Sequence, residues 1–141
     1  MAEQARDAYR AQAAFDRSVE LDRALRELVK IRASQINGCA FCIDMHTFEA
    51  RRMGESDRRL HAVGAWHESP LFSARERAAL AVTEALTRVA DAGLPDEVYA
   101  RAAAELDTEE IAQLIMAVAA INSWNRIAIA SGMVFEPPEE H

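Results

Sequence analysis

Hydrophobic residues recur along this chain at helical spacing, and no convincing run alternates apolar and polar positions as a half-buried strand would. Helices are therefore expected from one end to the other. The pattern predicts an all-α protein of about six to seven helices. The expected helices cover part of 2–15, then about 18–37, 39–53, 57–66, 73–91, a short segment after 95, and 107 to about 132.

Turn and capping residues mark where these helices begin and end. Gly38 is the expected end of the second helix, because glycine adopts the left-handed conformation that closes a helix. Ser73 and Glu76 have the spacing of a capping box, which opens the helix that follows. Gly93 to Pro95 breaks that helix, and 136–141 has the composition of a frayed, solvated tail.

The last expected helix is apolar around most of its circumference, which indicates burial on several sides. In a chain this small, such a helix is expected both to lie in the core and to pack against another subunit. Its apolar residues are Ile111, Leu114, Ile115, Met116, Val118, Ile121, Ile127 and Ile129.

Length and composition narrow the class of protein. The 141 residues fit one domain, 1–141, and 50% hydrophobic with 28% charged residues is an ordinary globular composition. A net charge of −7 argues against nucleic acid or an anionic membrane surface as the main partner. The first ten residues carry charges throughout, which is unlike a secretory signal, and no stretch has the apolar length of a membrane span. The cytoplasm, where thiols stay reduced, is the expected compartment.

The two cysteines of the chain, Cys39 and Cys42, fall within four residues of each other, and His46 follows one turn later. On a helix these three residues share one face. Two thiols beside an imidazole suit thiol–disulfide chemistry, because the base helps to form the reactive thiolate. Apolar neighbours on this helix would raise the pKa of a thiol, and the helix dipole at Cys39 and the imidazole of His46 would oppose that rise.

Other interpretations of this cluster remain open. Buried free cysteines behave as small hydrophobes, and His46 alone would be interpreted as a core histidine. Cys39, Cys42, His46 and one carboxylate would also make four zinc ligands. Structural zinc sites usually draw on two separated pairs, and no second CxxC occurs here, so neither a metal nor a cofactor is expected.

Judged from spacing alone, several other polar residues are expected to lie at the surface or to pack, without a role in chemistry. Glu27 sits at the margin of an apolar stripe, and a surface ion pair with Lys30 or Arg23 is favoured. Glu49 is expected in solvent. Packing and surface positions are expected for His61, His67 and the cluster Trp124-Asn125-Arg126.

The segment 27–47 strongly resembles the core motif of the alkylhydroperoxidase AhpD family, within the carboxymuconolactone decarboxylase-like superfamily. The family signature is a glutamate, eleven residues, CxxC, three residues and a histidine, and Glu27, Cys39, Cys42 and His46 match it at every spacing. The resemblance covers roughly residues 15–134. It implies a compact helical AhpD-like domain with the CxxC pair at the N-terminus of a buried helix, and it overrides the surface expectation for Glu27.

The resemblance implies a thiol-dependent peroxidase of antioxidant defence. By family analogy, Cys42 attacks a hydroperoxide, and Cys39 resolves the product by closing a Cys39–Cys42 disulfide. Glu27 and His46 form the proton relay that activates Cys42. Cys39 is expected nearer the exposed helix start, within reach of a reductant, for which a thiol or lipoyl-type protein is expected. A homo-oligomer, trimer or hexamer, is also implied.

Two alternatives differ in class from a peroxidase. One is a redox adaptor or protein disulfide reductase with little peroxidase activity of its own. The other is the non-redox decarboxylase chemistry found elsewhere in the superfamily, which does not need paired thiols and is therefore disfavoured by Cys39 and Cys42.

Overall fold

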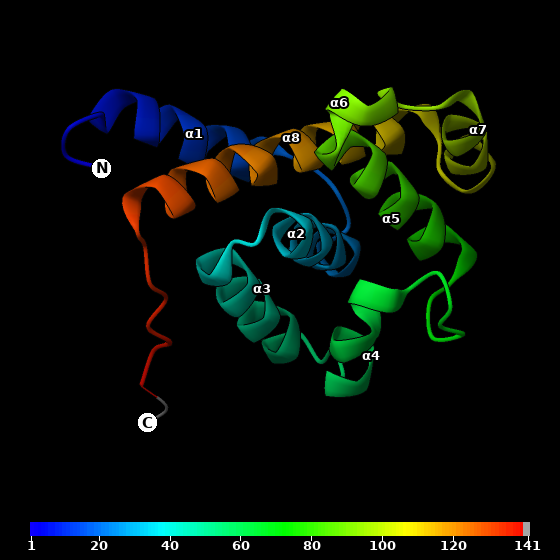
Figure 1. The fold of residues 1–141 in the computed structure, drawn as a ribbon, viewed down its shortest axis with the longest axis horizontal. Helices are drawn as coiled ribbons and strands as arrows, with labels where there is room; N and C mark the ends of the chain where they lie inside the picture. The colour runs from blue at the N-terminus through cyan, green and yellow to red at the C-terminus, as the bar shows by residue number, and fades with distance from the viewer. Residues whose placement is uncertain (140–141) are drawn as a thin grey trace.

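The computed structural model describes residues 1–139, and within that range the chain forms eight α-helices, one 3-10 helix and no strand. The prediction of an all-α protein is therefore confirmed. The elements are α1 (Arg6–Ser18), α2 (Arg23–Asn37), α3 (Ala40–Arg52), α4 (Asp57–Ala62), η1 (Val63–Ala65), α5 (Ala74–Thr87), α6 (Val89–Ala92), α7 (Asp96–Glu105) and α8 (Thr108–Ser131) (Figure 1).

Helix α2 lies at the centre of the molecule, with α3, α5 and α8 packed around it (Figure 1). It can do so because its apolar residues point in several directions and join three separate clusters. Leu25 and Val29 face α5, α7 and α8, whereas Leu28 and Ile31 face α3, α4 and η1. Ala33 packs with the two cysteines and with α8. Residues on α2 are thereby held against α3 and α8, next to the two cysteines.

Helix α8 packs as the long core helix of this fold. Eight of its residues are buried, including Leu114, Val118 and Ile121, which confirms that part of the prediction. Its other side is open, since Met116 and Ile129 are 47% and 53% exposed. By length and composition alone α8 could also cross a membrane, but the burial of its apolar face against α2 and α5 is that of a core helix.

The expected helix ends are confirmed where a specific residue makes them. Gly38 closes α2 with φ 69°, and the capping box of Ser73 and Glu76 opens α5. The first two helices differ from expectation. α2 begins at Arg23 instead of near 18, because the side chain of Asp22 accepts the N–H of Leu25. α1 occupies Arg6–Ser18, and so extends beyond the range 2–15 within which the first helix was expected.

The expected helix over 73–91 is split in two. Arg88 leaves the helical region, with φ −99° and ψ 41°, so α5 ends at Thr87 and the short α6 follows. This break accounts for eight α-helices in residues 1–139 instead of six to seven. In the expected tail 136–141, residues 136–139 carry no helix, and the last two residues lie outside the described range.

Candidate active site

The two cysteines lie at the junction of α2 and α3. The left-handed conformation of Gly38 turns the chain so that Cys39 becomes the N-cap of α3, and its sulfur accepts the backbone N–H of Cys42 at 3.4 Å. The Sγ atoms of Cys39 and Cys42 are 2.8 Å apart, and both cysteines are free. The pair therefore stands as a reduced dithiol, already oriented for a bond between the two sulfurs.

Glu27 and His46 form a buried pair beside this dithiol. Glu27 Oε2 lies 2.8 Å from His46 Nδ1, across the interface of α2 and α3. Glu27 is 9% exposed, so the surface position predicted from spacing alone is wrong. Because the carboxylate occupies Nδ1, Nε2 is the imidazole nitrogen left for proton exchange elsewhere.

Cys42 and His46 line a pocket of about 210 Å³. Its walls come from both ends of the chain, since Tyr9 lies on α1 and Trp124 on α8, with their rings edge to face at 5.3 Å. Most of the lining is apolar. The remaining lining residues are Asp16, Phe41, Met45, Ala128 and Met133. Cys42, not Cys39, is therefore the cysteine that lines this pocket.

Burial raises the pKa of Cys42 to about 12, and the neighbouring Cys39 adds to that rise. The direction agrees with the expectation for a thiol in apolar surroundings. A hydrogen bond from Asn125 and the positive charge of Lys30 act in the opposite direction. From the sequence, the helix dipole and His46 were expected to lower this pKa. An effect of Asn125 or Lys30 was not expected.

Buried Lys30 and half-buried Asp16 form a second ion pair near the pocket, with Nζ and Oδ1 2.7 Å apart. The Lys30 side chain is 5% exposed, and Asp16 contributes to the pocket lining from α1. Spacing on single helices did not reveal this pair, because its members lie on different helices. Asn125 offered one overlooked signal, a polar residue one turn after the apolar Ile121 and three residues before Ala128.

The prediction that Cys39 lies at an exposed helix start is wrong. Cys39 and Cys42 are each 1% exposed, because Ile121 and Ala128 of α8 cover the start of α3. Access to the dithiol therefore runs through the pocket beside Cys42.

The other polar candidates lie away from the thiols. Glu49 pairs with Arg52 at the surface, as expected. Exposed His67 stacks on Trp66 with ring centroids 3.6 Å apart, and His61 is also exposed. Across residues 1–139, no three His, Cys, Asp or Glu side chains are grouped so that they could hold a metal ion.

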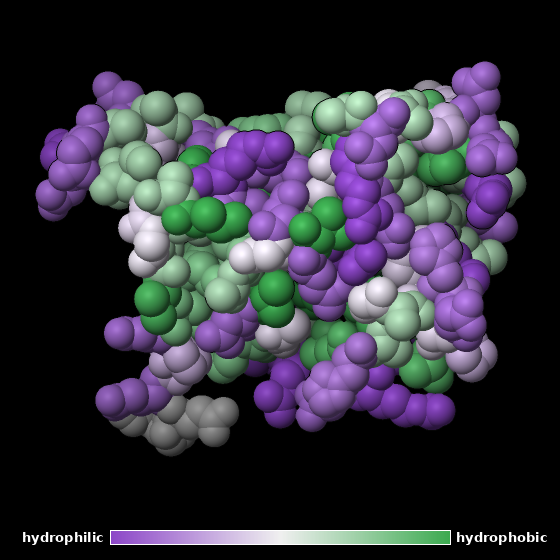
Figure 2. All heavy atoms as spheres, in the orientation of Figure 1, coloured by the Kyte–Doolittle hydropathy of each residue, from purple (hydrophilic) through white to green (hydrophobic). Residues whose placement is uncertain are grey.

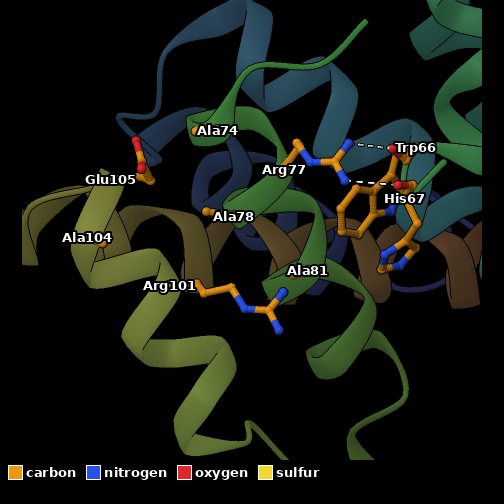
Figure 3. Close-up of a pocket in the computed structure, with 9 residues that line it drawn as sticks. All are labelled: Trp66, His67, Ala74, Arg77, Ala78, Ala81, Arg101, Ala104 and Glu105. Carbon is orange, nitrogen blue, oxygen red and sulfur yellow. Dashed lines mark hydrogen bonds between the residues drawn. The ribbon is translucent and has the colours of Figure 1, made fainter. Parts of the chain in front are cut away.

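A second pocket, of about 290 Å³, lies between α5, α7 and the turn after η1 (Figure 3). Arg77 in its wall donates to the carbonyl oxygens of Trp66 and His67, as drawn, and also to Ser69. That guanidinium therefore fixes the turn. The lining contains no thiol, so of these two pockets the one beside Cys42 is lined by a cysteine.

The chain belongs to the carboxymuconolactone decarboxylase family, whose sequence model matches residues 2–85. A solved structure of ATU0492 from Agrobacterium tumefaciens superposes with a TM-score of 0.91 at 38% identity, over 98% of this chain and 96% of that one. ATU0492 is described as a protein of unknown function assigned provisionally to the antioxidant defence protein AhpD. The AhpD resemblance of the sequence is thereby confirmed.

Two curated relatives are similar to the chain in sequence. YdfG of Bacillus subtilis is 46% identical over 118 residues, which cover 84% of this chain and 80% of YdfG. YnjA of Escherichia coli is 40% identical over 95 residues, or 67% of this chain and about half of YnjA (51%). The debrominase Bmp8, solved with 2,3,4-tribromopyrrole, has a TM-score of 0.82 at 19% identity, over 95% of this chain and 73% of Bmp8, a likeness of fold alone.

Proposed function

We propose that this chain is a thiol-dependent peroxidase that reduces hydroperoxides through a dithiol–disulfide cycle of Cys39 and Cys42. The observation that carries the proposal is the reduced dithiol, with sulfurs 2.8 Å apart, of which Cys42 faces a small apolar pocket shared with His46. Glu27 is hydrogen-bonded to that imidazole. A nucleophile, a base with its orienting carboxylate, and a resolving thiol are thus within one site.

In the first step, His46 takes the proton of Cys42, and the thiolate attacks one oxygen of the hydroperoxide. The O–O bond breaks, the sulfur becomes a sulfenic acid, and the alcohol leaves with the proton returned by His46. Cys39 then attacks the Cys42 sulfur, forming the disulfide and releasing water. A dithiol reductant of the thiol or lipoyl type restores both thiols by supplying two electrons and two protons.

The pKa of Cys42 explains why this site needs a base. Because burial raises that pKa to about 12, Cys42 is protonated near neutral pH, and attack requires removal of its proton. Glu27 stabilises the imidazolium that forms when His46 accepts this proton. General-base assistance of this kind is typically worth about 10²–10⁴-fold in rate.

The second candidate is a redox adaptor that exchanges disulfides with another protein. Both cysteines are 1% exposed and are reached through a pocket of about 210 Å³, which favours a small molecule over a protein disulfide as the oxidant. We also propose the cytoplasm as the compartment, since free proximal thiols persist there.

Peroxide consumption by the pre-reduced protein, with thiols counted before and after, tests the proposal. We expect one equivalent of organic hydroperoxide to be consumed and both thiols of the chain to be lost, with no background from other cysteines. Cys42→Ser should consume none. Its matched variant Cys39→Ser should consume one equivalent and leave a sulfenic acid that dimedone traps.

Two outcomes would count against the peroxidase. If both thiols survive exposure to peroxide, the dithiol cycle is wrong. If peroxide is ignored but a small disulfide substrate is reduced rapidly, the adaptor is the better description of the same dithiol.

A further inference from the structure

The pocket of about 290 Å³ between α5 and α7 is lined largely by alanine (Figure 3). Three of the alanines lie on one face of α5, because positions i, i+4 and i+7 of a helix share a face, and a fourth comes from α7. Their methyl groups are short, so an open space with apolar sides is left between the two helices. The four residues are Ala74, Ala78, Ala81 and Ala104.

Two guanidinium groups line the same pocket without a carboxylate partner. Arg77 donates to three backbone carbonyl oxygens of the turn after η1, so neutral acceptors alone meet its charge. Arg101 extends from α7 toward Ala81, and Figure 3 draws no hydrogen bond to it. Within residues 1–139, neither Glu97 nor Glu105, one turn away on each side along α7, forms an ion pair with Arg101. Its N–H donors are therefore free to bind a ligand.

Two carboxylates close to this pocket leave that positive charge in place. Glu84 accepts from Trp66 Nε1 at 2.6 Å and pairs with Arg32 Nε at 3.2 Å, so its oxygens are already used. Glu105 lines the pocket, but in Figure 3 it lies at the opposite end from the Trp66 ring. The pocket thus has a cationic end and an anionic end, with the alanines between them.

This distribution of charge selects one kind of ligand. A guanidinium binds a carboxylate through two parallel N–H···O bonds, and the alanine methyl groups suit an apolar body. Glu105 disfavours a second negative group at the far end. Stacking on the indole is excluded, because Trp66 is 2% exposed and His67 covers one of its faces. The volume is close to the lower end of small-molecule sites, about 300 Å³.

We propose that this pocket binds a small monocarboxylate with a compact apolar body, whose carboxylate pairs with the Arg101 guanidinium. Arg77 adds a fixed positive charge behind it, held in place by its bonds to the turn. The site lies on α5 and α7, apart from the dithiol, and involves no covalent step. The proposal is therefore independent of the peroxidase activity proposed above.

The test is a titration of the ¹⁵N-labelled protein with benzoate, followed by NMR, with benzamide as a neutral ligand of the same shape. The chain has two tryptophans, of which Trp66 lines this pocket and Trp124 lines the one beside Cys42. Their indole N–H resonances therefore report which pocket is occupied. Benzoate should shift the Trp66 resonance in a saturable manner, and benzamide should bind at least about tenfold more weakly.

Substitutions of exposed residues separate charge from shape. Arg101→Gln should weaken benzoate binding about tenfold, whereas Glu105→Gln should strengthen it about twofold to threefold, since the two charges act in opposite directions. Arg58→Gln is the matched control for Arg101→Gln, at an exposed position of α4 outside the pocket, and should leave the affinity unchanged.

A second pair of variants tests the space above the alanines. Ala104→Leu fills part of the pocket and should weaken binding, while Ala103→Leu, at the neighbouring exposed position that does not line it, should not. A shift at Trp124 without one at Trp66, equal affinity for benzamide, or equal affinities in Arg101→Gln and Arg58→Gln would each overturn the proposal. None of these measurements uses peroxide or a free thiol.

Discussion

The charged side chains around Cys42 occur as pairs. Glu27 binds His46, and Lys30 binds Asp16, each at a distance below 3 Å. A single charge in such surroundings would be costly, whereas a hydrogen-bonded pair is tolerated. Asp16 therefore has an electrostatic effect on the site. Its negative charge offsets the positive charge of Lys30, which lowers the pKa of Cys42.

Substitutions at the two ends of this pair should act in opposite directions on Cys42. Lys30→Met removes the favourable charge and should slow alkylation of Cys42 near neutral pH by roughly threefold to tenfold. Asp16→Asn leaves Lys30 unbalanced and should accelerate it by a similar factor. The measurement is the iodoacetamide rate at about pH 8 in a Cys39→Ser background, so that one thiol reacts. Changes of the same sign in both variants would mean that the pair acts only through packing.

At the scale of elements, the turn between α2 and α3 determines where the dithiol stands. Gly38 adopts φ 69°, and a Cβ atom placed there would meet no atom within 4 Å. The need for glycine is therefore conformational and not steric crowding. Cys39 follows directly as the N-cap of α3, so the same turn that ends one helix presents a sulfur to the start of the next.

Gly38→Ala should lower the free energy of unfolding by about 1–2 kcal/mol, the cost of the left-handed conformation for a residue with a side chain. Gly64→Ala is the matched control. Gly64 is not among the glycines with positive φ, and its added Cβ would make an ordinary contact of 3.5 Å with Gln35 Oε1. Its free energy of unfolding should be unchanged or higher by up to about 1 kcal/mol. Urea denaturation measures both, and equal losses in the two variants would contradict the conformational explanation.

For the whole molecule, the sequence predicted the parts that depend on one helix at a time. The all-α class, the end of α2 at Gly38 and the start of α5 at Ser73 follow from local signals. The break at Arg88 did not, since no glycine or proline marks it. The Glu27–His46 contact was reached through the family motif, because helical spacing alone placed Glu27 in solvent.

The remaining site residues could not be found from spacing, because their contacts join distant segments. Asn125 meets Ser34 across 91 positions and Asn37 across 88. A helical wheel describes which residues share a face, but not which face of another helix it meets. The packing of α8 against α2 supplies that missing information.

The surface of the single chain leads us to expect a homo-oligomer. On α8, Met116 and Ile129 are exposed, and Val89 and Tyr99 add further apolar area. α1 buries none of its residues. On the face shown in Figure 2, hydrophobic patches lie between hydrophilic ones. Burial of the apolar residues against another copy would remove them from water.

Light scattering should give a trimer or hexamer, that is, three or six times 15.6 kDa. Ile129→Glu should weaken the assembly, because it places a charge in the expected interface, while Arg58→Glu at an exposed position of α4 should not. A mass of one chain at micromolar concentration would contradict the expectation.

Part of the pocket wall comes from segments far in sequence from the residues that react. The reacting groups lie on α2 and α3, in the middle of the fold, whereas Tyr9 near one terminus and Met133 near the other supply much of the wall. Phe135, in the segment after α8, packs against Phe41 and Phe48. Wall residues such as Tyr9 and Met133 can therefore diverge in evolution, or be redesigned, with little effect on the sulfur chemistry. Such a division allows one reactive centre to serve many different molecules by changes at the two ends of the protein.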